Sequence, residues 1–310
     1  MKAIVIEQYG GAEELIEKEL PKPVIKDNQV LIEMHATSIN PIDWKVREGY
    51  MKEGMTFDFP LILGWDAAGV VSEVGENVTK FKVGDEVFAR PAMENGTYSE
   101  YVAVEEDLVA LKPQHVSFEE AASVPLAGLT AWQCIVDFGK IKAGDKILIH
   151  AGSGGVGSLG IQIAKSLGAY VLSTASGKNE AFLKELGVDE FINYETTDFT
   201  KVVKDVDLVV DTMGGEILQK SLDVVKPGGR LVSITGQPDA EKAKANNITA
   251  ELLWLNPNGK QLAELGELME KGKVNTHIGH TVPLTAEGLR EAHELSETHH
   301  AKGKIVISIK

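Results

Sequence analysis

The chain has 310 residues, of which 43% are hydrophobic and 25% charged, so it can bury a sizeable core and is expected to form two domains. Its formal net charge of −15 excludes nucleic acid and anionic membrane surfaces as expected partners. The apolar runs are too short for a membrane span, and no signal-peptide pattern is present, so we expect a cytoplasmic protein. The single cysteine, Cys134, excludes an intrachain disulfide and is predicted to be a buried packing residue.

Residues 1 to about 120 are predicted to be rich in β-strands. Short or alternating apolar segments are separated there by Gly, Pro, Asp and Asn turn signals, and no strand–helix alternation is present. The expected strands cover 3–6, 29–36, 68–74, 86–88 and 98–104.

From about residue 121 the pattern changes to alternating strands and helices, which predicts a doubly wound parallel sheet. Segment 240–247 is polar and is expected to be a solvated loop or a short helix, and the tail from 274 no longer follows the alternation. The expected strands are 146–150, 170–174, 190–193, 207–211 and 230–234, with helices ending at 168 and covering 179–186 and 216–225, and a turn at 226–229.

A glycine motif, Gly152-x-Gly154-x-x-Gly157, follows the strand predicted at 146–150 and precedes a helical pattern. In a dinucleotide-binding turn the first glycine permits the turn, the second lets the backbone approach a pyrophosphate, and the third lets the helix pack close to the strand. A plain strand-to-helix connection is the alternative, but the flanking strand and helix favour the dinucleotide. The expected contacts are Gly152, Ser153, Gly154, Gly155, Val156 and Gly157.

Several longer motifs spread over the whole chain carry a family resemblance. They are Ser38-Ile-Asn-Pro-Ile-Asp-Trp-Lys45, Phe59-Pro-Leu-Ile-Leu-Gly-Trp-Asp-Ala-Ala-Gly-Val-Val71, Val83-Gly-Asp-Glu-Val87, Gly96-Thr-Tyr-Ser-Glu-Tyr101, Gly128-Leu-Thr-Ala-Trp132, the glycine motif and Gly303-Lys-Ile-Val306. Together they resemble the medium-chain dehydrogenase/reductases, most closely the zinc-free quinone oxidoreductases and enone reductases.

The resemblance implies an α/β fold in which a Rossmann-type doubly wound parallel sheet is inserted in a GroES-like, partly open β-barrel catalytic domain. We expect a catalytic domain at 1–122, a dinucleotide-binding domain at 123–268 and a C-terminal segment, 269–310, that rejoins the catalytic domain. The resemblance also implies an active site in the cleft between the domains and a homodimer formed through the edge strand at 248–255.

The zinc ligands of related alcohol dehydrogenases are replaced in this sequence. Asn40, Trp65 and Leu126 match the Cys, His and Cys positions of those relatives, and none is a suitable Zn²⁺ ligand. The adjacent pair His299-His300 is expected at a solvent-facing helix end. We therefore expect no metal site, and without a Lewis acid the favoured acceptor is a quinone or an α,β-unsaturated carbonyl compound, because conjugation delocalises the arriving charge.

By resemblance, Asn40 and Thr130 lie beside the nicotinamide and its ribose, with a turn residue and a helix-end hydroxyl as the structural alternatives. Asn40 is the expected catalytic residue, and Tyr50 is a second candidate as proton donor, although an exposed loop tyrosine is equally consistent with its position. Asp43 and Asp66 are expected to orient neighbouring groups. The expected cofactor site also includes Thr235, Gly236 and Gly303.

The segment after the second strand of the parallel sheet predicts NADPH as the cofactor. An acid about 20 residues beyond the glycine loop would bind the ribose hydroxyls of NAD, but 172–179 contains none. Ser176 and Lys178 are instead expected to form a pocket for the 2′-phosphate, and the resemblance adds Tyr194. A solvated surface lysine is the alternative for Lys178.

The sequence thus predicts an NADPH-dependent, zinc-independent oxidoreductase acting on a quinone or an enone. Two alternatives remain open: an NADPH-binding sensor or structural protein with little turnover, and a zinc-independent alcohol or aldehyde reductase. The loops expected to line the acceptor, 47–60, 91–98 and 252–258, mix apolar and polar residues and do not identify it.

Overall fold

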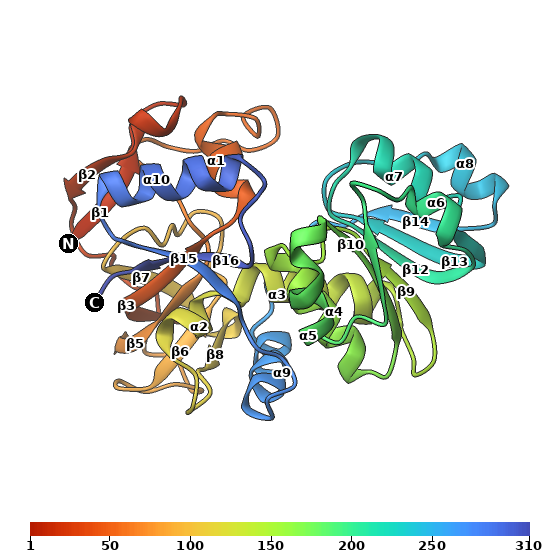
Figure 1. The fold of residues 1–310 in the computed structure, drawn as a ribbon. Helices are drawn as coiled ribbons and strands as arrows, with labels where there is room; N and C mark the ends of the chain where they lie inside the picture. The colour runs from red at the N-terminus through yellow and green to blue at the C-terminus, as the bar shows by residue number, and fades with distance from the viewer. The chain divides into compact units, whose positions relative to one another are not determined.

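The computed structural model describes all 310 residues and divides them into two compact units (Figure 1). Unit 1 contains Met1–Leu129, Pro257–Gly272 and Thr276–Lys310, and unit 2 contains Thr130–Asn256 and Lys273–Asn275. The two ends of the chain therefore share unit 1. These boundaries differ from the predicted ones, because 123–129 and 257–268 were expected in the dinucleotide-binding domain and lie in unit 1.

Unit 2 is built around a six-stranded sheet in the order β11-β10-β9-β12-β13-β14, and every neighbouring pair is parallel. This is the predicted doubly wound order: the chain winds outward from β9 to one edge and then from β12 to the other. The strands are β9 (Lys146–Ile149), β10 (Tyr170–Ala175), β11 (Glu190–Asn193), β12 (Val206–Asp211), β13 (Val225–Ser233) and β14 (Thr249–Leu252).

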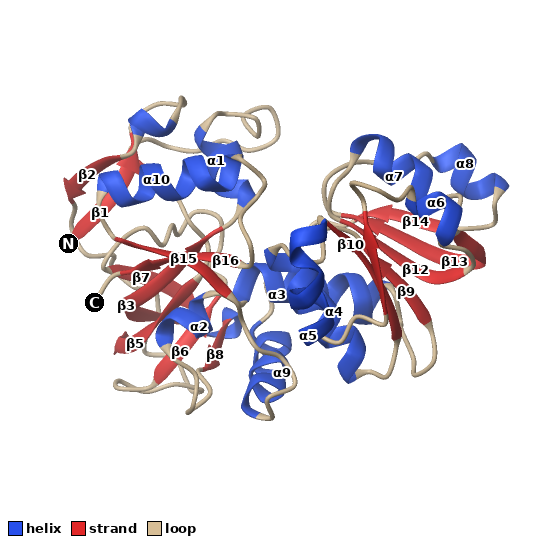
Figure 2. Ribbon diagram, viewed as in Figure 1, coloured by secondary structure: helices blue, strands red, loops and turns tan.

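The helices of unit 2 connect these strands (Figure 2), with α4 packed on β9 and β10 and α7 on β12 and β13. They are a π-helical turn (Gln133–Phe138), α4 (Gly155–Ser166), a 3₁₀ turn (Gly177–Asn179), α5 (Glu180–Glu185), α6 (Phe199–Val202), α7 (Gly215–Ser221) and α8 (Ala240–Ala245). The polar segment at 240–247 thus forms the short helix, and Cys134 is buried in the π-helical turn.

One predicted turn is part of a strand instead. Lys226-Pro-Gly-Gly229 was expected to precede the strand at 230–234, but β13 begins at Val225. The register with β12 jumps there, because Val206 pairs with Val225 and Leu208 pairs with Arg230. The extra residues bulge out of the ladder, with Gly228 at a φ of 81°, which explains why turn-type residues occur inside the strand.

Unit 1 holds a seven-stranded sheet in the order β15-β16-β3-β5-β6-β8, with β7 also paired to β3, and a small sheet β2-β1-β4. The strand β16 of the C-terminal segment runs antiparallel to β3, which brings Ile305 opposite Ile39. The strands are β1 (Lys2–Ile6), β2 (Ile16–Glu19), β3 (Gln29–Ile39), β4 (Leu61–Ile62), β5 (Ala67–Val74), β6 (Glu86–Ala89), β7 (Tyr101–Glu105), β8 (Val109–Leu111), β15 (Ile278–Pro283) and β16 (Lys304–Ser308).

The helices of unit 1 include α9, which the sequence pattern assigned to the other domain. Its apolar face packs on β8, and a Cβ on Gly266 would lie 3.4 Å from the Phe88 ring, so α9 completes the core of unit 1. The helical elements are 3₁₀ turns (Ala12–Glu14 and Glu106–Leu108), α1 (Pro41–Arg47), α2 (Phe118–Ala122), α9 (Gly259–Glu270) and α10 (Ala286–Glu297), while α3 (Pro125–Trp132) spans the boundary between the units.

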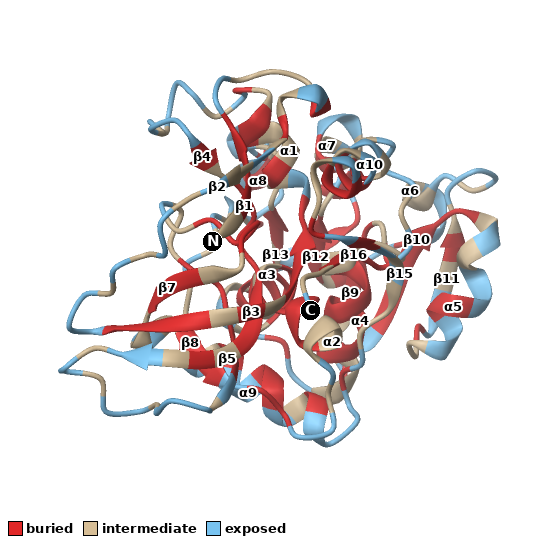
Figure 3. Ribbon diagram, turned by 90° about the vertical axis from the view of Figure 1, so that its left-hand side faces the viewer, coloured by how far each residue is buried: buried red, intermediate tan, exposed pale blue.

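Each unit has its own apolar core. In unit 2 the core is formed by strand residues such as Leu148, Val209 and Leu231, none of which is exposed. Figure 3 shows the buried residues concentrated along β3 in unit 1 and along β9 and α4 in unit 2. Strands buried on both faces read as near-continuous apolar runs, as β9 and β12 do. None of the helices combines the length and the apolar character that a bilayer-spanning segment requires.

Candidate functional site

The glycine motif lies at the carboxyl end of β9, in the loop that leads into α4. β9 and β12 are neighbours in the sheet, but the chain leaves them toward opposite edges. Ligands of open α/β sheets bind at such a switch point, outside the carboxyl ends of the strands. The motif is therefore located where a dinucleotide binds in this fold class.

Two of the glycines are required by close packing inside unit 2. A Cβ on Gly157 would lie 2.3 Å from the carbonyl oxygen of Ala151, and a Cβ on Gly152 would lie 2.1 Å from Oγ of Ser173. The role predicted for Gly157 is thus supported, but that of Gly152 needs correction. The left-handed residue of the turn is Ala151, with a φ of 50°, and Gly152 is needed for its approach to the neighbouring strand.

Gly154 has no such requirement. Its backbone is extended, with φ −82° and ψ 177°, and a Cβ there would meet only the Ala151 carbonyl oxygen, at 3.4 Å. It is the N-cap residue of α4, a helix of 12 residues whose free N–H groups and dipole favour an anion. The fold does not require a glycine at position 154. The open space beside Gly154 therefore suits a pyrophosphate bound close to the backbone.

A buried histidine holds this loop on the strands. His150 lies between the hydroxyls of Thr174 and Ser221, with Nδ1 3.1 Å from Thr174 Oγ1 and Nε2 2.9 Å from Ser221 Oγ. Burial lowers the pKa of His150 to about 4, so the ring is neutral at physiological pH. The backbone N–H of Ala151 also donates to Thr174 Oγ1, at 3.2 Å. Sequence reasoning missed these supporting residues, because Thr174 and Ser221 belong to no motif.

The predicted 2′-phosphate segment follows β10 and is joined to the glycine loop by Asn179. Its Nδ2 donates to Oγ of Ser153 at 3.2 Å and to Oγ of Ser176 at 3.1 Å. The structure thus brings Ser153 and Ser176 together, while Lys178 is exposed. Asn179 is therefore a further candidate for the cofactor site. The sequence prediction missed it, although it directly follows Lys178.

A carboxylate from the turn after β11 lies beside this segment. Oε2 of Glu195 accepts a hydrogen bond from the backbone N–H of Gly177, at 2.9 Å. Tyr194, the preceding residue, is 57% exposed. The Gly177 N–H, between Ser176 and Lys178, is thus already bound to a carboxylate, and this acid lies outside the 172–179 segment.

Thr235 and Gly236 follow β13 and lie, like the glycine motif, at the carboxyl ends of the strands. Asp211, at the end of β12, organises this corner: it accepts hydrogen bonds from Ser233 Oγ at 2.7 Å and from Thr235 Oγ1 at 3.2 Å. Ser233 Oγ in turn accepts from the Gly236 N–H at 3.2 Å. Asp211 is fully buried, so its role is to fix this loop beside the glycine motif.

In unit 1, Asn40 is held between an acid and a lysine. Its Nδ2 donates to Oδ2 of Asp66 at 2.7 Å, and its Oδ1 accepts from Nζ of Lys304 at 2.6 Å. Asp66 also accepts from Ser38 Oγ at 2.5 Å and from the Leu126 N–H at 2.6 Å. The side chains of Ser38, Asn40, Asp66 and Lys304 are all buried, so Asp66 orients its neighbours as expected.

These contacts do not fit a zinc ion. Both ends of the Asn40 side chain are used by charged partners, Trp65 donates its Nε1–H to the Met93 carbonyl at 3.0 Å, and Leu126 has no ligand atom. No group of three or more His, Cys, Asp and Glu side chains is arranged to hold a metal ion.

A second buried network lies behind Asn40. Oδ2 of Asp43 accepts from the Asn40 N–H at 2.9 Å and from the Tyr98 hydroxyl at 2.7 Å. That hydroxyl is 3.1 Å from Nε2 of His293, whose Nδ1 is 3.1 Å from NH1 of Arg47. Burial raises the pKa of Asp43 to about 7, and burial together with the Arg47 charge lowers the pKa of His293 to about 3.

The remaining predicted residues have different surroundings. Tyr50 is 67% exposed and contacts the Trp44 ring, and the hydrogen bond and charge of Glu48 raise its pKa, which makes it a weaker acid. Thr130 is buried in α3. Gly303 has a φ of 69°, and a Cβ there would lie 2.1 Å from a backbone carbonyl oxygen, so backbone geometry already explains this glycine.

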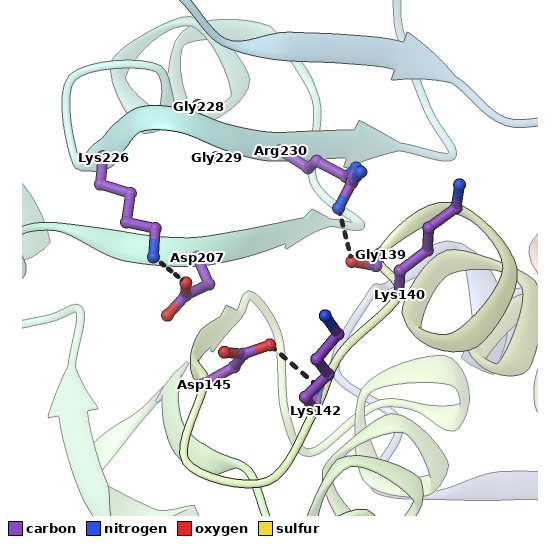
Figure 4. A pocket seen from close by; sticks show the side chains of 9 residues that line it. All are labelled: Gly139, Lys140, Lys142, Asp145, Asp207, Lys226, Gly228, Gly229 and Arg230. Atoms are coloured by element: carbon purple, nitrogen blue, oxygen red, sulfur yellow. Dashed lines mark hydrogen bonds and ion pairs between the residues drawn. The ribbon is translucent and has the colours of Figure 1, made fainter.

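A hollow of about 210 Å³ in unit 2 lies at the opposite end of the strands from the glycine motif (Figure 4). It lies at the amino ends of β9, β12 and β13, where Lys226 pairs with Asp207 and Arg230 donates to the Gly139 carbonyl at 3.1 Å. Ligands of this fold class bind at the carboxyl ends, so we assign no ligand to this hollow.

Two known protein families match parts of this chain, and the matched residues lie in both units. The family described as "Alcohol dehydrogenase GroES-like domain" matches residues 26–114, and that described as "Zinc-binding dehydrogenase" matches 186–307. The chain is 37% identical over 317 residues to the NADPH-dependent alkenal/one oxidoreductase, chloroplastic, of Arabidopsis thaliana, covering 99% of this chain and 79% of that protein.

Solved structures give the same picture. The quinone oxidoreductase of Coxiella burnetii superposes with a TM-score of 0.90 at 38% identity, covering 100% of this chain and 99% of that one. The Escherichia coli quinone oxidoreductase complexed with NADPH superposes with a TM-score of 0.90 at 28% identity, covering 99% of this chain and 100% of that one.

Proposed function

The chain belongs to the medium-chain dehydrogenase/reductase superfamily, in its quinone oxidoreductase-like branch, and from this premise we propose that it transfers a hydride from NADPH to a quinone or an α,β-unsaturated carbonyl compound. The observation that carries the proposal is the combination of an open dinucleotide cradle at Gly154 with an Asn40 site that suits hydrogen bonding and not zinc. The printed names of the relatives, an alkenal/one oxidoreductase and quinone oxidoreductases, support the same substrate class.

In this proposal the residues of unit 2 hold the cofactor. The amino end of α4 and the Gly154 backbone bind the pyrophosphate, and Ser176 and Lys178 bind the adenosine phosphate. The bound dinucleotide supplies the hydride. Residues of unit 1 then have to orient the acceptor and stabilise the negative charge that develops on its oxygen, for which a remaining N–H of Asn40 is the proposed donor.

We expect NADPH oxidation with a small quinone or a small enone, and negligible NADP-linked oxidation of ethanol. A conjugated acceptor spreads the arriving charge without a metal, whereas an alkoxide needs a Lewis acid to form and be held. Steady-state rates measured with an acceptor panel at fixed NADPH test this ranking. Ethanol oxidation faster than quinone or enone reduction would favour the alternative of an alcohol or aldehyde reductase. Tight NADPH binding with no turnover of any acceptor would favour a sensor or structural protein.

Metal content is the control for this experiment. Elemental analysis of the purified protein is expected to find less than stoichiometric zinc, and incubation with a chelator is expected to leave the quinone or enone rate unchanged. Stoichiometric zinc whose removal abolishes activity would show that the proposal of zinc independence is wrong.

The preference for NADPH over NADH is expected to depend on two residues of opposite charge. Replacing Lys178 with Glu should raise the KM for NADPH by roughly one to two orders of magnitude and affect NADH less, because a charge-assisted contact to the 2′-phosphate is lost. Replacing Glu195 with Gln should lower the KM for NADPH several-fold, since it removes a negative charge beside the Gly177 N–H that would repel a 2′-phosphate.

The matched control is Lys184, another lysine of unit 2, which pairs with Glu180 one helical turn away. Lys184→Glu is expected to leave both KM values unchanged. A parent protein that prefers NADH, or a Lys178→Glu variant that loses both cofactors equally, would contradict the assignment.

We further propose a homodimer with β14 at the interface. β14 pairs with β13 on one side only; its last residue, Leu252, is 38% exposed, and Trp254, just beyond it, is 57% exposed. An unpaired edge with exposed apolar side chains suits pairing with a second copy. Light scattering is expected to give twice the chain mass of 33.5 kDa, and a monomer at micromolar concentration would refute this proposal.

A further inference from the structure

The positions that correspond to zinc ligands in related enzymes converge on a buried ion pair. Asp66 contacts the Asn40 side chain and the Leu126 N–H, and it directly follows Trp65. The cation of the pair is Lys304, which reaches this place because β16 is paired with β3. Asp66 is fully buried and Lys304 is 5% exposed.

The ammonium group of Lys304 makes all its hydrogen bonds within this cluster. Its Nζ donates to the Ile39 carbonyl at 2.9 Å and to Asn40 Oδ1 at 2.6 Å, and it lies 3.4 Å from Asp66 Oδ2. An ammonium group has three N–H donors, so none is left for a substrate. Lys304 therefore cannot itself be the donor to an acceptor oxygen, and any role in the reaction acts through its neighbours.

The ion pair fixes the orientation of the Asn40 carboxamide. Its oxygen faces the ammonium of Lys304 and its NH₂ group faces the carboxylate of Asp66. Rotating the amide by 180° would place NH₂ against NH₃⁺ and C=O against the carboxylate, and both contacts would be repulsive. One Nδ2–H is bound to Asp66, which leaves the second in a single, defined direction.

We propose that Lys304 is a positioning residue for Asn40, and that its buried ammonium fixes the Asn40 carboxamide so that the second Nδ2–H can donate to the carbonyl oxygen of the acceptor. The inference rests on the proposed function, since it names the group that orients the proposed donor. A cation supplied by the protein thus occupies the cluster in which related enzymes are expected to hold zinc, and it acts by orienting a hydrogen-bond donor.

The first test needs no cofactor. In the apo protein labelled with ¹⁵N, the Lys304 ammonium is expected to give an observable ¹H–¹⁵N signal, because a buried and fully bonded NH₃⁺ group exchanges slowly with water. Lys304→Met should remove that signal and shift the side-chain amide signals of Asn40, which Asn40→Ala identifies. An Asn40 amide that does not respond to Lys304→Met would overturn the inference.

The second test is kinetic. Lys304→Met is expected to lower kcat for the enone roughly 10- to 100-fold, as misplacement of a catalytic group does, while the Kd for NADPH changes less than about threefold. Asn40→Ala should lower kcat to a similar degree, and the double variant should lose no more than Asn40→Ala alone, because both act through one donor. Lys304→Arg, which keeps the charge, should recover part of the rate.

Two further variants separate positioning from stability. Lys112 is a second buried lysine of unit 1, bound to Glu86 and to the carbonyls of Pro113 and Val116, and Lys112→Met should leave kcat of the folded protein unchanged. If Lys304→Met fails to fold, the variant Lys304→Met with Asp66→Asn removes both charges and takes its place.

Each outcome decides one question. Equal loss of kcat in Lys304→Met and Lys112→Met, or additive effects of Lys304→Met and Asn40→Ala, would overturn the positioning role. A parent protein without NADPH turnover would refute the proposed function instead, and the apo measurement would still decide whether Lys304 orients Asn40.

Discussion

Replacing Gly154 with alanine is expected to raise the Kd for NADPH about 100-fold, close to 2.7 kcal/mol, and to lower the free energy of unfolding by less than about 1 kcal/mol. The backbone of Gly154 is extended, and a Cβ there would have only the Ala151 carbonyl oxygen nearby, at 3.4 Å, so the fold accepts alanine. The methyl group would instead occupy the space that the pyrophosphate needs at the amino end of α4. Titration of NADPH fluorescence and denaturant unfolding measure the two quantities.

Two other glycines of α4 provide matched controls. A Cβ on Gly157 would lie 2.3 Å from the Ala151 carbonyl oxygen, so Gly157→Ala should lower the free energy of unfolding by about 1–3 kcal/mol. The nearest atom to a Cβ on Gly160 is Ile135 Cδ1, at 3.4 Å, so Gly160→Ala should keep the parent stability and the parent Kd. Gly154→Ala binding NADPH as tightly as the parent protein would place the pyrophosphate elsewhere.

The sequence predicted the parts of the fold that depend on residues close together in the chain. The glycine motif, the strand before it and the helix after it lie within about 20 residues, and the strand–helix alternation predicted the doubly wound order that the parallel pairings confirm. The exceptions are also local: the turn residues at 226–229 are accommodated as a bulge in β13 because β12 continues beside them.

Contacts between distant residues were not predictable in this way. Asp66 and Lys304 are 238 positions apart, and no spacing relates them until β16 pairs with β3. The supports of the glycine loop, Thr174 and Ser221, likewise reach His150 only through neighbouring elements of the folded unit. A helix such as α9 shows its apolar face in the sequence, but not which of two domains that face covers.

The free energy of unfolding is expected to fall by about 1.4 kcal/mol when the pH is lowered from 6 to 5. This equals one proton, the net of two buried histidines and of Asp43, which acts in the opposite sense. Burial holds the pKa of His150 near 4 and that of His293 near 3, against about 6.5 in the unfolded chain. Their contribution is complete above pH 6.5 and is lost as the pH falls toward the folded values, because the unfolded chain binds two more protons. Partly buried His35, whose pKa burial also lowers, adds to this direction.

Asp43 acts in the opposite sense, and this gives the experiment its sharpest contrast. Its pKa is about 7 in the folded protein against about 3.8 when unfolded, so the folded state binds one more proton at pH 5–6 and Asp43 opposes the two histidines. Asp43→Asn should therefore double the loss to about 2.8 kcal/mol per pH unit, and His150→Asn should reduce it to nearly zero. Denaturant unfolding at several pH values measures these slopes, and parallel curves for the three proteins would show that neither residue titrates on unfolding as inferred.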